Sequence, residues 1–343
     1  MTAPPRRSWA LPAQALASAL VLAILLWEAE PARVWATLRA ASPAWVLIAV
    51  VSKGLCVALH ELRLWVALRA RGEAPLGRVM AIGFVSGLMN TVLPMRGGDL
   101  VAAGLLRAEL GLSLGASLAA VGITGFLEAL VFAVFVLGVL IVGAKEWSVL
   151  LGAAQTAQAQ GTLSVVLGAG VFVCVGLILL SRRLGAPAAA APRAGPITLL
   201  RDSVVHAGAG LSAWGYVAVN LALAAVQVAL LVLSFWALLP ALGLHPPLAM
   251  LAVSGVIGLG SVAAVALPPS LGAGPAATSV FVLAFFGIGE ADALGFAALS
   301  WLANSLPPLV LGILPLWSRI GRLSDLTRRD APSEAMLKEP PNP

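Results

Sequence analysis

The sequence predicts an all-α integral membrane protein, and three observations carry that prediction. Hydrophobic residues make up 60% of the chain and charged residues 10%, and the mean hydropathy is +0.99. Residues 203–289 contain no Asp, Glu, Lys or Arg. Because a helix needs about 20 residues to cross a bilayer, this stretch must hold several spans. The 35 Gly and 23 Pro lie in apolar runs rather than in polar linkers, which argues against a soluble protein.

Windows free of charged residues predict about eight transmembrane helices. They lie near residues 10–27, 43–68, 115–143, 162–181, 211–239, 247–267, 274–289 and 294–317. The segment 79–110 is too charged to cross in the same way, so we interpret it as a re-entrant helical hairpin. The short span 274–289 is a candidate for a second hairpin. We expect residues 1–318 to form one polytopic domain and residues 319–343 to form a disordered basic tail.

Basic residues gather on one side of this topology. They are Arg6, Arg7, Arg63, Arg69, Arg71, Arg78, Arg182, Arg183, Arg193, Arg201, Arg319, Arg322, Arg328, Arg329 and Lys338. By the positive-inside rule this side is the cytoplasm, so both termini are expected there, in a cell inner membrane. The net charge of +6 then reflects topology rather than nucleic-acid binding. We interpret residues 182–209 as a cytoplasmic loop, and Glu290 with Asp292 as an outward-facing loop.

Two segments break the helical pattern in a related way. Asn90-Thr91-Val92-Leu93-Pro94-Met95-Arg96-Gly97-Gly98-Asp99 and Leu267-Pro268-Pro269-Ser270-Leu271-Gly272 share the pattern Leu-Pro-x-x-x-Gly. Proline and glycine interrupt a helix, and the freed backbone groups are tolerated at membrane depth only inside protein or beside water. The broken elements, 79–110 and 254–289, therefore predict an inverted repeat of the kind found in carriers.

The broken segments also supply the candidate residues for substrate binding or translocation. These are Asn90, Pro94, Arg96, Gly97, Gly98, Asp99, Pro268 and Gly272. Arg96 either binds a phosphate together with the neighbouring glycine amides or anchors the segment at the interface. Asp99 either holds Arg96, carries a coupling proton or caps the following helix. Asn90 either donates to substrate or satisfies the carbonyl that the proline leaves free.

Charged residues inside predicted spans are the candidates for proton coupling, because a charge at bilayer depth is costly and usually functional. Glu128 has no charged neighbour nearby in its span, and Lys53, His60 and Glu61 share another span. For Lys53, His60 and Glu61 the alternative is internal pairing. The three histidines are scattered, and no phosphate-binding loop or nucleophile elbow is present. We therefore expect no metal site, no cofactor and no enzyme activity.

Several of these motifs resemble the lysylphosphatidylglycerol synthase transmembrane family, the flippase-like proteins. Residues 90–106, with Arg107 and the turn at 111–113, resemble the first signature of that family. Residues 267–272 and the ending Leu62-Arg63-Leu64-Trp65 are also similar to it. The resemblance covers nearly the whole chain. It implies a polytopic membrane protein with re-entrant helices that moves lipids or lipid-linked molecules between leaflets.

The chain departs from this family at several charged positions. Ala102 stands where the family usually has Arg, and Thr124, Gly125 and Glu128 replace a Glu-Arg…Asp cluster. An expected Glu falls near Pro275 and an expected Arg near Asn304. These departures favour a substrate with little charge, such as a polyprenoid, a hopanoid-like lipid or a neutral glycolipid. A membrane-embedded transferase using Asp99 or Glu128 as base, and a non-transporting assembly subunit, are the alternative functions.

Overall fold

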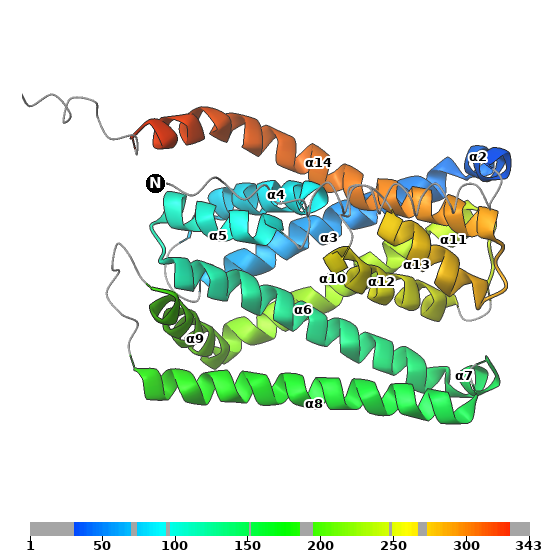
Figure 1. Cartoon of the computed structure of the whole chain (residues 1–343), viewed down its shortest axis with the longest axis horizontal. Helices are drawn as coiled ribbons and strands as arrows, with labels where there is room; N and C mark the ends of the chain where they lie inside the picture. The colour runs from blue at the N-terminus through cyan, green and yellow to red at the C-terminus, as the bar shows by residue number, and fades with distance from the viewer. Residues whose placement is uncertain are drawn as a thin grey trace, which may run out of the picture.

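The described part of the chain folds entirely into helices. The computed structural model describes residues 31–69, 74–93, 97–150, 152–185, 195–246, 249–266 and 273–329. Its helices are α2 (Pro31–Ala40), α3 (Pro43–Arg69), α4 (Leu76–Val92), α5 (Gly97–Leu110), α6 (Leu114–Val142), α7 (Ala144–Leu150), α8 (Ala153–Leu184), α9 (Pro196–Ser212), α10 (Trp214–Trp236), α11 (Leu238–Ala241), α12 (Ala249–Ala266), α13 (Ala273–Ala284) and α14 (Glu290–Arg329). Figure 1 shows them as one elongated bundle.

Five stretches of helix are long and apolar enough to cross a membrane: Pro43–Arg69, Leu114–Val142, Ala154–Leu184, Trp214–Ala241 and Glu290–Trp317. They correspond to five of the predicted spans, which confirms an all-α protein with several potential membrane-spanning helices. The predicted span 10–27 lies outside the described residues. The predicted spans 247–267 and 274–289 correspond to the shorter helices α12 and α13.

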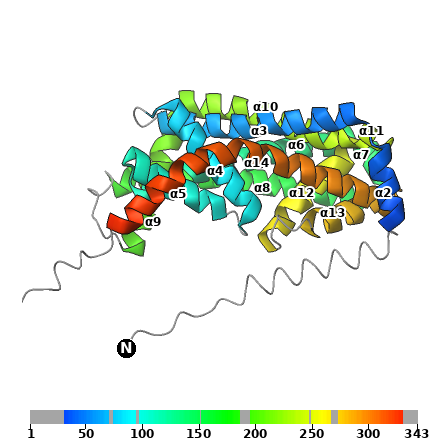
Figure 2. The same ribbon diagram turned by 90° about the horizontal axis from the view of Figure 1, so that it is seen from above.

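Helices α3 and α10 form an antiparallel pair that runs through the bundle (Figure 2). Near one end Ser234 Oγ donates to the Ala49 carbonyl at 2.8 Å, and near the other Asn220 Nδ2 donates to the Arg63 carbonyl at 3.0 Å. Polar side chains of α10 thus bond to the backbone of α3. In an apolar environment such bonds fix the register of the two helices, because an unpaired polar group there is costly.

The predicted break in 79–110 separates α4 from α5, and the two helices pack against each other as a helical hairpin. Ser86 Oγ of α4 donates to the Gly98 carbonyl of α5 at 2.9 Å. A Cβ atom at Gly98 would overlap the Ser86 carbonyl oxygen and lie 2.6 Å from the Asn90 nitrogen. Glycine at this position therefore lets the two backbones approach closely.

The second broken element, 254–289, is likewise divided into two packed helices, α12 and α13. Helix α14 packs along both hairpins, on α13 near its beginning and on α4 farther along (Figure 1). A Cβ atom at Gly312 of α14 would lie 2.5 Å from the Phe84 carbonyl oxygen of α4. The two broken elements are thus joined by contact with one long helix.

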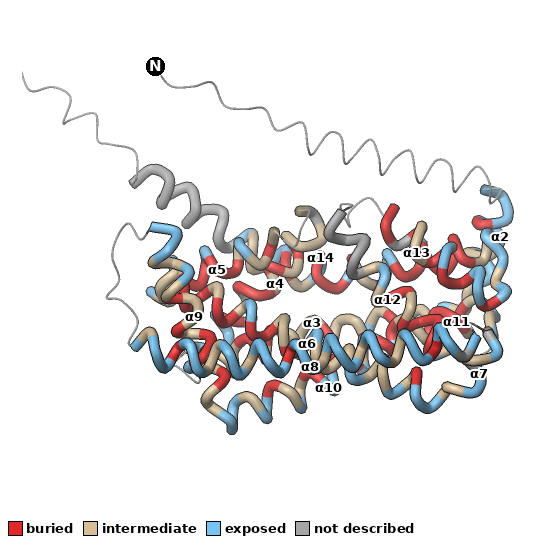
Figure 3. The backbone as a smooth tube through the Cα atoms, turned by 60° about the horizontal axis from the view of Figure 1, so that its bottom comes forward, coloured by how far each residue is buried: buried red, intermediate tan, exposed pale blue. Residues whose placement is uncertain are grey.

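The outer surface is strongly apolar, as expected for a membrane protein. Helix α8 lies at one edge of the bundle and is largely exposed along its length (Figures 1 and 3). Its exposed side chains include Val165, Phe172 and Leu179. Exposed hydrophobic residues over a long helix are compatible with contact to lipid rather than to water.

Two loop predictions are wrong. Within 182–209, which we interpreted as a loop, residues from Pro196 form α9, which packs between α6 and α8. Its buried residues include Asp202, Val205, Gly208 and Leu211, which recur every third position and face its neighbours. Glu290 and Asp292 form the first turn of α14 rather than a loop.

The C-terminal tail and the position of Arg63 also differ from what the sequence predicts. Helix α14 continues through Arg329, so the first residues of the expected disordered tail are helical. Arg63 was counted among the cytoplasmic basic residues, but its side chain is fully buried in the bundle. It therefore carries no weight in the orientation argument.

Candidate functional site

A cavity with a partly polar lining lies between the helices of the bundle and has a volume of about 390 Å³. Residues from α3, α4, α6, α10, α12, α13 and α14 line it, so both broken elements contribute to its wall. Its polar lining residues are Lys53, Asn90, Thr91, Glu128, Thr278, Ser300, Asn304 and Ser305. A concave site with a few polar groups among apolar ones is the usual form of a small-molecule site.

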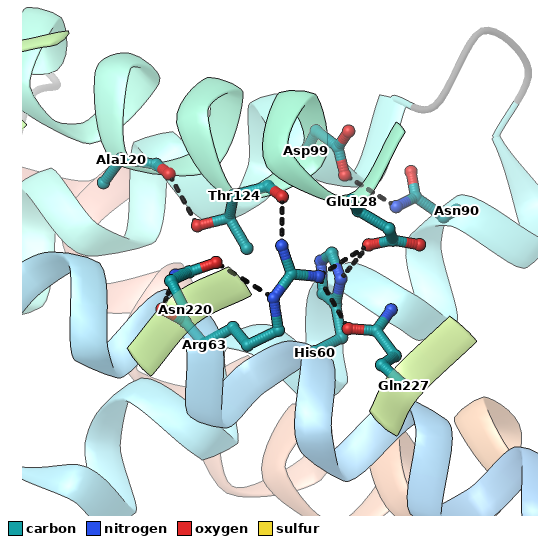
Figure 4. Close-up of polar contacts among 9 residues, drawn as sticks. All are labelled: His60, Arg63, Asn90, Asp99, Ala120, Thr124, Glu128, Asn220 and Gln227. Carbon is teal, nitrogen blue, oxygen red and sulfur yellow. Dashed lines mark hydrogen bonds and ion pairs between the residues drawn. The ribbon is translucent and has the colours of Figure 1, made fainter. Parts of the chain in front are cut away.

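Behind Glu128, the guanidinium group of Arg63 is surrounded by polar groups from two other helices, α6 and α10 (Figure 4). Arg63 Nη1 donates to Glu128 Oε2 at 3.1 Å and to Gln227 Oε1 at 2.7 Å. Its Nε donates to Asn220 Oδ1 at 3.0 Å, and its Nη2 donates to the Thr124 carbonyl at 2.6 Å. Arg63 therefore ties α3 to both α6 and α10, with its charge compensated by a carboxylate and by dipoles.

The proton-coupling candidates occupy different parts of this site. His60 Nδ1 lies 3.0 Å from Glu128 Oε2, so Glu128 bridges His60 and Arg63. Glu61 is 3% exposed and points away to α4, where its carboxyl group occupies the space a Cβ atom would need at Gly83. Lys53 lines the cavity. His60 of α3 and Glu128 of α6 are thus paired with each other.

At the first helix break, Asn90 Nδ2 donates to Asp99 Oδ1 at 2.8 Å, which links α4 to the first turn of α5 (Figure 4). Asn90 also lines the cavity. Gly97 begins α5, and Gly98 is buried against α4. Asn90 and Asp99 are therefore held together where α4 ends and α5 begins.

The other candidates from the two breaks, Pro94, Arg96, Pro268 and Gly272, lie outside the described residues. In the described part of the chain, no group of three or more His, Cys, Asp or Glu side chains is placed to hold a metal ion.

The amide side chains of this site were not predicted from the sequence. Asn220 and Gln227 lie seven residues apart, so they share one face of a helix that carries no charge. Two amides at this spacing in an apolar span are a detectable signal for an interhelical polar contact. Asn304 stands near the position where the family pattern has an Arg, and the structure places it on the cavity wall.

Comparison with known families identifies the family of this chain. The profile of the lysylphosphatidylglycerol synthase TM region matches residues 13–312, which is most of the chain. The chain belongs to this family. The predicted resemblance is therefore confirmed, and with it a multi-pass membrane protein related to lipid modification or transport. No curated protein matches the sequence.

Proposed function

We propose that the protein moves a lipid or a lipid-linked molecule between the leaflets of the cytoplasmic membrane, with the headgroup passing through the polar cavity. The observation that carries this proposal is the cavity itself, which places Lys53, Asn90 and Glu128 among apolar helices. Ionisable groups at this depth are costly, and they usually serve a pathway for a polar or charged substrate. Family membership supports a lipid as the substrate.

The two hairpins fit a re-entrant role. Helix α5 has 14 residues and α13 has 12, so at 1.5 Å per residue they are about 18–21 Å long. The hydrocarbon core is about 30 Å thick, so neither crosses it alone. In this proposal α4–α5 and α12–α13 enter and leave the bilayer on one side each. The remaining long helices, including the segment 10–27, span the membrane, and both termini lie in the cytoplasm.

An apolar groove next to the cavity offers a place for the acyl chains. The groove has a volume of about 440 Å³ and lies between α3, α4 and α14. Gly54 and Pro307 line it, whereas their neighbours Lys53 and Pro308 line the cavity. The Cβ atom that Gly54 lacks would lie 3.8 Å from Pro307 Cβ. In this proposal the headgroup of a lipid lies in the cavity and its acyl chains lie in the groove. The contact between α3 and α14 at Gly54 and Pro307 separates the two.

Leaflet exchange in reconstituted vesicles tests the proposal. Labelled lipids should exchange faster in liposomes containing the purified protein than in protein-free liposomes. Lys53→Met should slow exchange by about 3- to 10-fold, which is the effect expected when one polar contact to the substrate is lost. Methionine has a similar length and no charge, so it is tolerated inside the membrane.

Lys145→Met is the matched control, because Lys145 is exposed on α7 and does not line the cavity. It should exchange lipids at the wild-type rate. A wild-type rate no higher than that of protein-free liposomes, for every lipid tested, would contradict transport and would favour a transferase or an assembly subunit. Equal loss of rate in both lysine variants would contradict the role given to the cavity.

A further inference from the structure

The cavity wall carries both hydrogen-bond donors and acceptors, and several of its donors are used within their own helices. Asn304 Nδ2 donates to the Ser300 carbonyl at 2.7 Å, and Ser300 Oγ donates to the Ala297 carbonyl at 2.9 Å. Thr91 Oγ1 donates to the Gly87 carbonyl at 3.1 Å. Because a carbonyl can only accept, these bonds fix which atom of each side chain acts as the donor. Each of these groups thus uses one N–H or O–H within its own helix, and its side-chain oxygen keeps its lone pairs. The second N–H of the Asn304 amide and the Lys53 ammonium can still donate, so the wall suits a ligand that both accepts and donates.

Two further acceptors lack their usual donors, one buried between α4 and α5 and one in α14. Asn90 uses its Nδ2 for Asp99, and its Oδ1 is buried with no hydrogen-bond partner in the described part of the chain. Pro308 has no N–H group, so the Asn304 carbonyl four residues earlier loses its helical donor. Asn304 and Pro308 both line the cavity. The Asn304 carbonyl therefore needs another donor, which a ligand or water can supply.

The charges on the wall favour neither a strongly acidic nor a strongly basic ligand. Lys53 contributes one cation. Glu128 contributes one carboxylate, whose Oε2 already accepts a hydrogen bond from Arg63. Phe235 and Trp301 add aromatic rings to the wall. Aromatic rings next to amides and hydroxyls suit a ligand with both apolar and hydroxyl-bearing faces.

The donors and acceptors of the wall suit some classes of lipid headgroup better than others. A phosphate or a carboxylate only accepts hydrogen bonds, so it leaves the amide oxygens unsatisfied. A primary ammonium only donates, and it is repelled by Lys53. A hydroxyl group donates to the oxygens and accepts from Lys53.

We propose that the cavity binds an uncharged, polyhydroxylated headgroup, such as a sugar linked to a lipid. This inference rests on the proposed function and names the substrate class of the same site. The volume of about 390 Å³ lies within the range of about 300–1,000 Å³ found for small-molecule sites.

Binding of three lipids with identical acyl chains tests the inference. The purified full-length protein is titrated in detergent with a monohexosyl diacylglycerol, with phosphatidic acid, and with a phosphate-free diacyl lipid that carries a primary ammonium group. Native mass spectrometry gives the bound fraction of each. We expect the hexosyl lipid to bind about 10-fold more tightly than either charged lipid, because each hydroxyl satisfies an acceptor that they leave unpaired or repel.

Variants of the wall separate a hydroxyl site from an anion site. Asn304→Leu keeps the volume but removes the side-chain acceptor, and it should weaken hexosyl-lipid binding by about 10-fold. Asn304→Asp keeps an oxygen acceptor and should weaken it by less. Lys53→Met should cost about 3- to 10-fold rather than abolish binding. Thr162→Val on α8 is the control, since Thr162 is exposed and bonds only to the Gln158 carbonyl of its own helix.

Tightest binding of phosphatidic acid, abolished by Lys53→Met, would overturn the inference in favour of an anion site. Tightest binding of the ammonium lipid, or an Asn304→Leu variant that binds like Thr162→Val, would also overturn it. Leaflet exchange without headgroup preference in binding would keep the proposed transport and overturn this inference. Selective binding of the hexosyl lipid without any leaflet exchange would keep this inference and overturn the transport.

Discussion

Replacing Arg63 with methionine is expected to lower the free energy of unfolding by about 3–5 kcal/mol, the usual cost of removing one partner of a buried ion pair. Arg63 is fully buried, and its guanidinium supplies donors to Glu128, Asn220, Gln227 and the Thr124 carbonyl. Without it, Glu128 loses its arginine partner, and the amide oxygens of Asn220 and Gln227 lose the donor that Arg63 supplies away from water. Chemical unfolding in detergent, followed by tryptophan fluorescence, measures the loss.

Arg69→Met is the matched control, since Arg69 lies at the end of α3 with its guanidinium 5.0 Å from the centre of the Trp65 ring. An exposed contact of this kind contributes about 0.5–1 kcal/mol. A double variant with Glu128→Gln should lose less stability than the sum of the two single variants, because each change removes the same pair. Equal, small losses for Arg63→Met and Arg69→Met would show that the buried network does not stabilise the fold.

The second large effect is expected at Gly98. A methyl group there would overlap the Ser86 carbonyl oxygen, and it would lie 2.6 Å from the Asn90 nitrogen. Both are backbone atoms, so the clash is relieved only if α5 moves away from α4. We expect Gly98→Ala to destabilise the protein by about 1–3 kcal/mol, as overpacking of a rigid interior does. It should also slow leaflet exchange, because the Asn90–Asp99 contact spans the same interface.

Gly104→Ala provides the comparison on the same helix, because a Cβ atom at Gly104 would meet nothing within 4 Å. Alanine is the better helix former, so this variant should be as stable as the wild type or more stable by up to about 1 kcal/mol. Thermal unfolding of both variants in the same detergent measures the difference. A Gly98→Ala protein that unfolds at the same temperature as Gly104→Ala would contradict the close packing of the hairpin.

The elements that could be predicted from sequence are those with local causes. The division of 79–110 into two helices follows from the Pro94 and Gly97-Gly98 segment, and long charge-free runs predict α6 and α10. Helix α9 was missed because its apolar face alternates with polar residues, so a search for charge-free windows passes over it.

The polar network of the site could not be predicted because its partners are distant in sequence. Arg63 lies near the end of a predicted span, where basic residues usually mark the cytoplasmic side. Its partner Glu128 is 65 residues away and Gln227 is 164 residues away. Glu128 looks isolated in its own span for the same reason. Only the packing of α3 against α6 and α10 brings these groups together.

Lipid exchange by a variant with a filled cavity tests the central claim, that the headgroup passes through the cavity, most directly. Gly260 of α12 lines the cavity, and a Cβ atom there would lie 3.7 Å from Thr278 Oγ1, an ordinary contact distance. Gly260→Leu should therefore fold and occupy part of the space. Gly122→Leu on α6 is the control, since Gly122 is exposed with nothing within 4 Å of its missing Cβ atom.

The account predicts that Gly260→Leu lowers leaflet exchange of labelled lipid by about 10-fold or more, an effect of about 1.4 kcal/mol on the barrier. Gly122→Leu should leave the rate unchanged. Equal exchange rates for the wild type and for both variants, at equal amounts of folded protein, would contradict passage of the headgroup through this cavity.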